Sequence, residues 1–324
     1  MNDRKKISIA LATYNGERYL EEQLNSFLSQ TILPDEIVIS DDNSTDSTLT
    51  ILKNFKKKAP FSVELLINNG KGFNNNFENA LKNTNGDLVF ISDQDDMWLD
   101  HKIESIYSFF QKNSKYQLLI HDLEYCDSQM KPIGQTKIER IKLYDPSLKG
   151  YVTGMATVVR SNFLSSCLPL SKNTNYDSWI HNCASVAGLR IVKDDMLALY
   201  RRHENNATKG SFVNRNVKTG SLDVLFNKMK NIPSHKIKKT RNTLNDLLEY
   251  LNSNKNLLVR TFLVDNFEEK IRSLENEIQF LNERIEILNK ARIFRFPRLL
   301  NLWFTNGYDQ YSGYKSMLKD LFYK

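Results

Sequence analysis

Three acidic side chains lie within the four-residue segment Asp93–Asp96, whose sequence is Asp-Gln-Asp-Asp. The segment follows an apolar stretch, Asp87–Ser92, that is predicted to be a β-strand, and it precedes the apolar pair Met97–Trp98. Alternate residues at a strand end can point into one cleft. Mg²⁺ and Mn²⁺ prefer oxygen ligands and leave coordination positions for phosphate and water. The segment therefore predicts a divalent-cation site that neutralises a diphosphate, with a solvated acidic turn as the alternative.

A second acidic pair, Asp41–Asp42, follows another apolar stretch, Glu36–Ser40. Carboxylates accept hydrogen bonds from the N3–H of uracil or thymine and from ribose hydroxyls. The polar segment Thr13–Asn15 follows a third apolar stretch, Ile7–Ala12. Together with the first acidic segment, these clusters predict one nucleotide-binding cleft.

The elements that position the three clusters alternate between strand and helix patterns. This order favours right-handed crossovers and a mostly parallel sheet, and ligands of such sheets bind at the carboxyl ends of the strands. The predicted fold class is therefore α/β, an open sheet flanked by helices. The expected strands are 7–12, 36–40, 62–67 and 87–92, and the expected helices are 18–30, 45–57 and 74–82. Short strands at 117–120, 155–159, 190–192 and 196–200, and a helix after Asp177, are expected to complete the sheet and build the acceptor side.

The motifs resemble those of family 2 glycosyltransferases with the GT-A fold, in the same order and spacing from about Ile7 to Gly210. Within this family, the Ser-Asp-Gln-Asp-Asp-x-Trp version most resembles bacterial rhamnosyltransferase-like enzymes that build surface polysaccharides. Tyr176 stands where the family has histidine in its His-Asp-x-Trp segment. The segments that carry the resemblance are 13–15 with Glu17, 41–46, 69–70 with Gly72 and 75–76, 92–96 with Trp98, Gly154 with 160–161, 176–179, and 200–203 with 205–206.

The resemblance implies a role for each matching residue. Asp95 is expected to bind the metal, Mn²⁺ or Mg²⁺, and His203 to approach the metal or the diphosphate. Asp93 is expected on the ribose side, whereas the role of Asp96 stays open. Gly154 is expected in the acceptor loop. The expected nucleotide-sugar contacts are Thr13, Tyr14, Asn15, Glu17, Asp41, Asp42, Asn75 and Asp93, with Asp42 and Glu17 at the nucleoside and Asp41 as a further candidate for the base or ribose. A surface histidine beside Arg201 and Arg202 is the alternative for His203.

Asp177 is the candidate general base. An inverting transfer needs a carboxylate that removes the acceptor proton while the hydroxyl attacks the anomeric carbon. The alternative is that Asp177 is a helix N-cap, because a helical run follows it, and both roles can coexist. The resemblance implies transfer of one sugar from thymidine-diphosphate rhamnose, or from a uridine-diphosphate hexose, to a hydroxyl of a lipid-linked glycan acceptor.

The chain is predicted to have a transferase domain at residues 1–220 and a helical region at 221–324. In that region, Ile271, Leu274, Ile278, Leu281, Ile285 and Leu288 form a heptad pattern within residues 267–288. Ile at a and Leu at d favour a parallel two-stranded coil, hence a homodimer. The alternative is an amphipathic helix that folds back on its own chain. The stretch after Arg292 mixes Arg with aromatic and aliphatic residues, a composition that fits either a membrane interface or a docked terminal helix.

The net charge of +7 and the pI of about 9.0 suit phosphorylated substrates, an anionic membrane or nucleic acid. A nucleic-acid partner is not expected, because the basic residues are dispersed and form no recognised module. We expect a cytoplasmic protein, peripheral at the inner face of the plasma membrane. The three cysteines are widely spaced, and the apolar start is better explained as a strand than as a signal peptide. The sequence also contains no long apolar run.

Other protein classes fit the sequence less well. An oxidoreductase of this fold needs a Gly-x-Gly-x-x-Gly turn after the first strand, and the chain has none there. A nucleotidyltransferase usually carries a glycine- and lysine-rich loop near its start, and a processive synthase carries membrane spans with Gln-x-x-Arg-Trp. A non-catalytic nucleotide-sugar-binding or scaffold protein, dimerised through the helical region, is the remaining alternative.

Overall fold

The computed structural model describes residues 4–143, 145–204, 234–291, 294–304, 308 and 314–322. They form two compact units. The first unit contains the described residues up to 204 together with 254–265, and the second contains 234–253 and the described residues from 266 onward. The domain boundary predicted at 220/221 lies outside the described residues.

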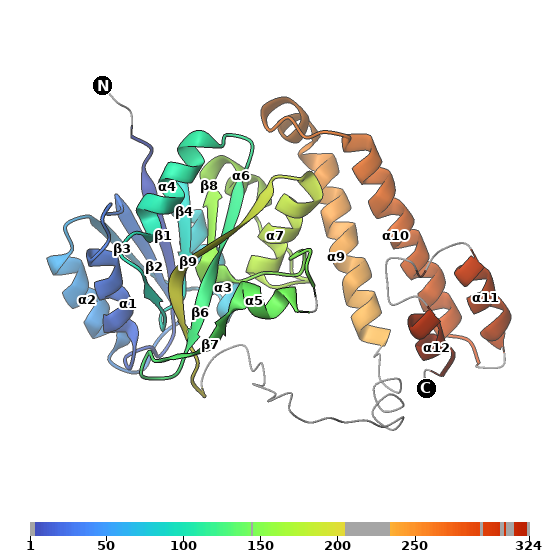
Figure 1. Cartoon of the computed structure of the whole chain (residues 1–324), viewed down its shortest axis with the longest axis horizontal. Coiled ribbons are helices and arrows are strands. Elements are labelled where there is room, and N and C mark those ends of the chain that lie inside the picture. Colours follow the sequence, from blue (N-terminus) through green and yellow to red (C-terminus); the bar gives the residue numbers. More distant parts are fainter. Residues whose placement is uncertain are drawn as a thin grey trace. The chain divides into compact units, whose positions relative to one another are not determined.

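A nine-stranded sheet forms the centre of the first unit, and Figure 1 shows it flanked by helices. Half of this sheet is parallel, in the order β3-β2-β1-β4, so the carboxyl ends of these strands lie at one edge. The alternation of strand and helix follows the predicted order. The elements are β1 (Ile7–Thr13), α1 (Leu20–Leu28), β2 (Glu36–Asp41), α2 (Thr48–Lys58), β3 (Ser62–Ile67), α3 (Phe73–Lys82) and β4 (Leu88–Ser92).

Helices α1 and α2 begin later than predicted, because the residues before them bond to each other instead. The backbone N–H of Glu17 donates to Asp46 Oδ2 (3.1 Å), and the N–H of Ser47 donates to Glu17 Oε2 (2.9 Å). The loops after β1 and β2 are thereby tied together.

The remaining strands make the sheet mixed. β8 pairs antiparallel with β4, β6 pairs antiparallel with β8, and β9 runs parallel to β6. The two short strands predicted at 190–192 and 196–200 are one strand, β9, with a register shift opposite His121 and Asp122. The elements are β5 (Met97–Trp98), α4 (Lys102–Lys112), β6 (Leu118–Cys126), β7 (Pro132–Thr136), α5 (Lys137–Lys142), a 3₁₀ turn (Gly154–Ala156), β8 (Thr157–Arg160), α6 (Ser161–Cys167), α7 (Tyr176–Ala187) and β9 (Arg190–Arg201).

Helices α4, α5 and α6 were not predicted. The signal for α4 is present, because Ile103, Ile106 and Phe110 recur at helical spacing and are buried. Every residue of β1 and β4 is buried, which is typical of parallel strands with both faces covered. The three cysteines are buried and unpaired with one another.

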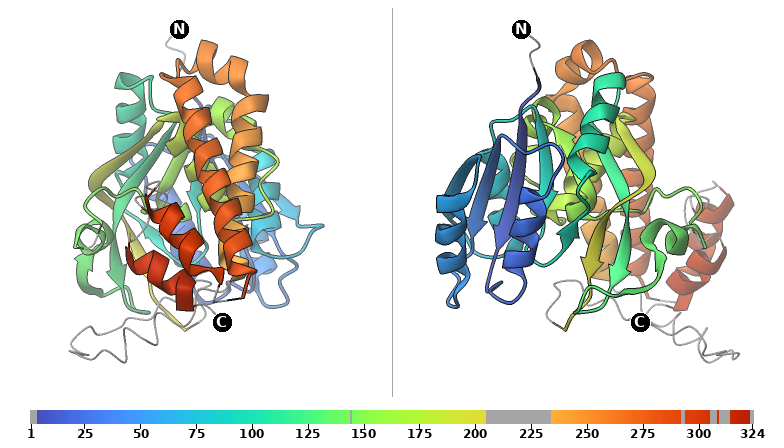
Figure 2. Two further views of the ribbon diagram at one scale, coloured as in Figure 1. Left: turned by 90° about the vertical axis from the view of Figure 1, so that its right-hand side faces the viewer. Right: turned by 60° about the vertical axis from the view of Figure 1, so that its left-hand side comes forward.

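The second unit is helical. Figure 2 shows α9 and α10 side by side, and Phe280 and Leu281 of α10 share an apolar core with Ile237 of α9. Among the described residues, no helix has the length and apolar character that a membrane span requires. The helices are α9 (Ser234–Ser253), α10 (Phe267–Leu288), α11 (Phe296–Phe304) and α12 (Tyr314–Phe322). The π-helical turn Leu257–Thr261 belongs to the first unit, where Phe262 contacts Phe163.

The heptad side chains of α10 pack within the chain. Five of the six are buried, and Ile278 is half-buried. Arg284, at a position that a two-stranded coil leaves at its edge, is instead buried in a two-bond ion pair with Asp320 of α12. The packing is that of a helix folded into its own chain.

Candidate active site

The loops after β1, β2 and β4 meet at one edge of the sheet. Thr13 is paired with Asp41, and Leu11 with Ser92, so the next residues of all three strands emerge together. The amide of Gln94 joins two of the loops, because it accepts from the N–H of Tyr14 and donates to its carbonyl, each at 2.9 Å. Gly16 leaves room for this bridge, since a Cβ there would lie 2.3 Å from Gln94 Oε1 and would displace the amide.

Asp41 is completely buried and holds the second loop in place. Its Oδ2 accepts from Thr13 Oγ1 (2.7 Å) and from Ser44 Oγ (2.6 Å), and its Oδ1 accepts from the Ser44 N–H (2.7 Å). Both oxygens and the Thr13 hydroxyl therefore already have partners inside the protein. Thr13 and Asp41, which were predicted as ligand contacts, therefore shape the loop.

Asp42 is half-buried and anchors the loop after β3. It accepts from Asn68 Nδ2 (2.7 Å) and from the N–H of Gly72 (3.0 Å), a residue with φ of +86°. Asn75 is exposed and donates to Lys71 O. The neighbouring Asn76, which sequence reasoning did not select as a site residue, is buried and donates to Thr13 O (3.0 Å).

Tyr14, Asn15 and Glu17 line the first loop. Asn15 Oδ1 accepts from the N–H of Thr45 (2.9 Å), and Glu17 accepts from Ser47 as described above. The Tyr14 side chain is 56% exposed, so its ring has an open face that a ligand can cover.

Asp95 and His203 form the predicted metal pair. Asp95 Oδ2 lies 2.8 Å from His203 Nε2, although the residues are 108 positions apart. Tyr19 packs against the imidazole, with ring centroids 4.8 Å apart. The described residues contain no group of three or more His, Cys, Asp or Glu arranged as a metal site. Two protein ligands nevertheless fit Mn²⁺ or Mg²⁺, because these ions commonly take few side chains and complete their shell with phosphate and water.

The charges around this pair repel each other. Burial, and then the negative charges of Asp95 and Asp177, raise the pKa of Asp93 to about 7. Burial and the same loop's carboxylates also raise the pKa of Asp96. A cation bound at Asp95 would relieve this repulsion, which supports the fit of a metal at this place.

Asp96 lies beneath the loop. It is 1% exposed, its Oδ1 accepts from the N–H of Arg201 (2.9 Å), and its Oδ2 has no hydrogen-bond partner among the described residues. Buried Lys102 lies nearby, with its ammonium 3.7 Å from the Trp98 ring and bonded to Met155 O (2.8 Å). Asp96 therefore faces the interior.

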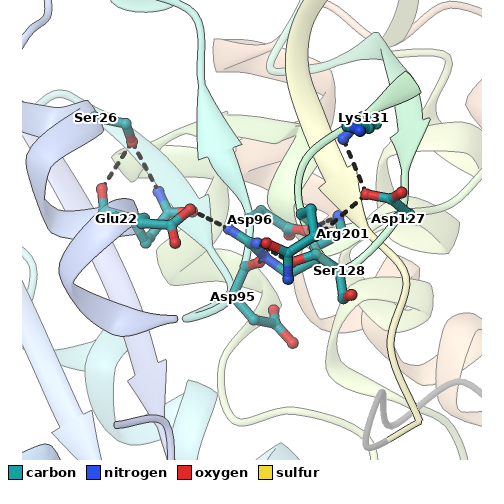
Figure 3. Close-up of polar contacts among 10 residues, drawn as sticks. Glu22, Ser26, Asp95, Asp96, Asp127, Ser128, Lys131 and Arg201 are labelled. Carbon is teal, nitrogen blue, oxygen red and sulfur yellow. Dashed lines mark hydrogen bonds and ion pairs between the residues drawn. The ribbon is translucent and has the colours of Figure 1, made fainter. Parts of the chain in front are cut away.

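Arg201 holds the acidic loop through polar contacts with several segments, as Figure 3 shows. Its guanidinium donates to Asp95 O (2.8 Å), to Ser128 O (2.7 Å) and to Glu22 Oε2 (2.6 Å). It also lies 4.4 Å from the centroid of the Tyr19 ring. Arg201 is 1% exposed, and the Tyr19 ring that it contacts also packs against His203, so Arg201 holds Asp95 directly and lies beside the packing of the histidine. Sequence reasoning missed this role, because its acceptors come from three distant segments.

The acceptor side is built by close packing. Gly154 lies against Tyr176, and a Cβ on Gly154 would be 1.8 Å from the Tyr176 hydroxyl oxygen. Tyr176 is buried and stacks on Phe77, with ring centroids 3.9 Å apart. The tyrosine that replaces the family's histidine is therefore matched to this glycine.

Asp177 is the second residue of α7, and the N-cap position belongs to Asn175. The N-cap alternative for Asp177 is wrong, because the chain is still extended at Asn175 and the helix has begun before Asp177. Asp177 Oδ1 accepts from the N–H of Ser178 (2.6 Å). Burial raises the pKa of Asp177, while this hydrogen bond and the positive charge of Lys137 act against the rise.

Lys137 is a residue of this region that the sequence did not single out. Its ammonium donates to Thr153 Oγ1 (2.5 Å), in the segment before Gly154. Burial lowers the pKa of Lys137 to about 8, and the charge of Asp177 is the largest influence in the opposite direction.

Residues 205 and 206, which carry the resemblance together with 200–203, lie outside the described residues.

Together these residues bring polar groups that suit a charged nucleotide close to a half-buried carboxylate, Asp177. The carboxyl ends of β1, β2 and β4 supply polar groups for the nucleotide, and Asp95 with His203 suits a cation that binds its phosphates. Asp177 can accept a proton on the other side. The arrangement suits transfer of a group from a nucleotide to a hydroxyl.

Comparison with known proteins gives the same assignment. Residues 8–162 match the model of glycosyl transferase family 2. The dTDP-rhamnosyl transferase RfbG of Shigella flexneri is 29% identical over 232 residues, which cover 67% of this chain and 80% of that protein. An uncharacterized glycosyltransferase of Nostoc is 27% identical over 221 residues, which cover 62% of this chain and 66% of that protein, just under two thirds of its length.

Solved structures share the fold. Staphylococcus aureus TarS (residues 1–349) in complex with UDP-GlcNAc matches with a TM-score of 0.56 and 19% identity, over 97% of this chain and 90% of that one. The mannosyltransferase PcManGT of Pyrobaculum calidifontis, in complex with GDP-Man and Mn²⁺, matches with a TM-score of 0.52 and 12% identity, over 99% and 86%. Residues 8–162 thus correspond to a family 2 glycosyltransferase domain, and the fold is GT-A-like.

Proposed function

We propose that this protein is an inverting, divalent-metal-dependent glycosyltransferase that moves one sugar from a nucleoside-diphosphate sugar to an acceptor hydroxyl. The main support is the meeting of two groups from distant segments. Asp95 and His203 are paired at 2.8 Å, and the carboxylate of Asp177 lies close enough to raise the pKa of Asp93. A metal pair beside a second, half-buried carboxylate suits such a transfer.

Asp95 and His203 would hold Mn²⁺ or Mg²⁺. When bound there, the cation neutralises the charge that develops on the departing nucleoside diphosphate. The use of Mn²⁺ in the PcManGT complex supports a divalent ion in this fold. Asp42, Glu17, Tyr14, Asn15 and Asn75 would surround the nucleoside, while Thr13 and Asp41 hold the loop.

Asp177 would act as the general base. It removes the proton of the acceptor hydroxyl while that oxygen bonds to the anomeric carbon, from the face opposite the diphosphate. The bond from the anomeric carbon to the diphosphate oxygen breaks, and the nucleoside diphosphate leaves with the electron pair. A pKa raised by burial makes Asp177 a stronger base, provided that it stays ionised at the working pH.

Thymidine-diphosphate rhamnose is the proposed donor. The support is the acidic motif together with the similarity to RfbG, which extends over most of both chains. A uridine-diphosphate hexose is the second candidate, since TarS was crystallised with UDP-GlcNAc. The proposed acceptor is a lipid-linked glycan in bacterial surface polysaccharide synthesis.

We also propose that the helical unit touches the cytoplasmic face of the membrane. Phe294, Phe296 and Phe304 are 63%, 50% and 77% exposed, and Arg298 on the same helix is exposed as well. Aromatic side chains beside a cation suit an anionic lipid interface. Dimerisation through α10 has no part in this proposal, because the heptad side chains pack within the chain.

A panel of nucleotide-sugars tests the donor and the metal. We expect dTDP-rhamnose with Mn²⁺ to raise the melting temperature more than GDP-mannose or UDP-glucose does. Addition of EDTA should abolish that rise. A shift of equal size under chelation would contradict metal-mediated diphosphate binding.

Two isosteric substitutions test catalysis. Asp95→Asn and Asp177→Asn should each lower sugar transfer by about 10³-fold or more, since each removes a charge that acts in the transition state. Asp95→Asn should also weaken the donor-induced melting shift, whereas Asp177→Asn should leave it intact. Asp194→Asn, at an exposed residue paired with Lys142, is the matched control. Undiminished transfer in both site variants would refute the assignment, and donor binding without any transfer by the wild type would favour the scaffold alternative.

A further inference from the structure

Lys137 is held rigidly at the start of α5. A capping box encloses it, in which the Glu139 N–H donates to Thr136 Oγ1 (3.3 Å) and the Thr136 N–H donates to Glu139 Oε2 (3.0 Å). The N–H of Ile138 donates to Asp122 Oδ1 (2.9 Å), which ties the helix to β6. The backbone that carries the Lys137 side chain is therefore held on both sides.

The ammonium of Lys137 lies in a partly aromatic environment. It is 5.5 Å from the centroid of the Tyr151 ring and 5.9 Å from that of Tyr200. Its hydrogen bond to Thr153 Oγ1 uses one of the three N–H donors that a lysine carries. The Thr153 hydroxyl in turn donates to Val152 O (2.6 Å). The Lys137 ammonium thus keeps N–H donors that this hydrogen bond does not use. Burial removes water from around its charge.

The segment that Lys137 contacts leads directly to Asp177. Thr153 precedes Gly154, which lies against the hydroxyl of Tyr176, the neighbour of Asp177. Further bonds hold this segment to α7, because Thr157 Oγ1 donates to Thr153 O (2.7 Å) and lies 2.8 Å from His181 Nε2. The contacts form one continuous path from the lysine to the candidate base.

The charges of Lys137 and Asp177 favour each other. Among the charged groups that act on Lys137, Asp177 favours the ammonium most, Arg202 opposes it, and Asp96 and Asp93 favour it more weakly. Lys137 is in turn the cation that favours the ionised form of Asp177. Burial works against both charges, so each depends on the other.

We propose that Lys137 is a positioning residue of the transfer reaction, which keeps the Asp177 carboxylate ionised and holds the acceptor segment through Thr153. The inference rests on the proposed function, because it assigns a partner to the proposed base. A base must be ionised before it can accept a proton, and in this buried place a neighbouring cation provides that condition. Lys137 acts through Asp177 and does not itself react with the sugar.

The pH dependence of turnover tests the role. Release of nucleoside diphosphate from the donor identified by the panel is measured from pH 5 to 9.5 with Mn²⁺ present. In Lys137→Met, the acid limb of the kcat profile should move to higher pH, by about one unit, so that kcat at pH values below the wild-type limb falls about tenfold with the donor KM unchanged. Lys137→Arg keeps the charge and should restore the acid limb.

Thr153→Val separates the charge from the hydrogen bond. It removes the hydroxyl acceptor and keeps the ammonium, so the acid limb should stay in place. An acid limb in Lys137→Met identical to that of the wild type overturns the inference, and so does an equal shift in Thr153→Val. Circular dichroism and melting curves show whether each variant is folded.

Lysine NMR tests the same coupling without turnover. With ¹³C-lysine incorporated and the Lys137 signal assigned from Lys137→Arg, the Asp177→Asn variant should titrate at lower pH than the wild type, because the ammonium loses its main favourable charge. An unchanged titration overturns the inference even if Lys137→Met fails to fold. A wild-type protein that transfers no sugar rejects the proposed function and the inference with it, whereas normal transfer with unaltered Lys137→Met profiles rejects the inference alone.

Discussion

The donor side and the acceptor side of the site are held together by different forces. On the donor side, the loops 13–17, 41–46 and 93–96 are fixed by short hydrogen bonds, such as the three that Asp41 accepts. On the acceptor side, Gly154 and Tyr176 meet by close packing, and Lys137 and Asp177 keep charges in a buried place. Satisfied donor loops give a preorganised cradle for a charged nucleotide. Incompletely compensated charges shift the pKa values of Asp177 and Lys137 on the acceptor side, and also that of Asp93 in the acidic loop.

The largest effect should come from Arg201, which holds the donor side together. Arg201→Met removes the donor of two carbonyls and the ion pair of the half-exposed Glu22, and it should lower the free energy of unfolding by about 2–4 kcal/mol, mainly through the two carbonyls. Urea unfolding measures it. Arg201→Lys keeps the positive charge but cannot donate to the three acceptors in the same geometry. Its free energy of unfolding should therefore lie between those of the wild type and Arg201→Met. A loss below about 1 kcal/mol in Arg201→Met would show that the hydrogen bonds do not hold this side.

A second comparison separates support from binding within the donor side. Asp41→Asn should lower stability by about 2 kcal/mol, because a buried charged acceptor of three hydrogen bonds is lost. Asp42→Asn should have a smaller effect on stability and a larger one on donor affinity, measured by calorimetry. The reverse outcome would make Asp41 the nucleoside contact.

Packing on the acceptor side is tested at Gly154. Gly154→Ala should lower stability by about 1–3 kcal/mol, since its methyl group would overlap the Tyr176 hydroxyl. Tyr176→Phe in the same chain should recover part of that loss, as it removes the oxygen but leaves the ring. Equal melting temperatures for the single and double variants would mean that the hydroxyl is not the obstacle.

The smallest effect should be an acid sensitivity that arises from two buried histidines. Burial lowers the pKa of His121 and of His181, so both stay neutral in the folded chain. The unfolded chain binds protons at these histidines below about pH 6.5, and stability should therefore fall as the pH drops from 7.5 to about 5.8, by about 1 kcal/mol for each histidine. His181→Gln should flatten the decline measured by urea unfolding at several pH values. A slope unchanged in that variant would locate the sensitivity elsewhere.

The donor side could be predicted well because its residues follow consecutive strands. The ends of β1, β2 and β4 are apolar runs that stop at polar residues, and parallel pairing brings such ends to one edge without further information. The pairing of Asp95 with a late histidine was expected only from the family resemblance, because the two residues are 108 positions apart. The late starts of α1 and α2 were not predictable, because they depend on bonds between two loops.

By itself, the sequence determined the α/β class, the order of the first strands and the segments that carry acidic and amide side chains. These properties follow from periodicity and from residue type, which are local. Tertiary structure alone decided that Asp41 and Asp96 are buried, that Arg201 holds the acidic loop, that the heptads of α10 pack within the chain and that Lys137 lies on the path to Asp177. The reason is physical, because burial, charge coupling and hydrogen-bond partners depend on segments more than 30 residues apart, whose meeting no local pattern records.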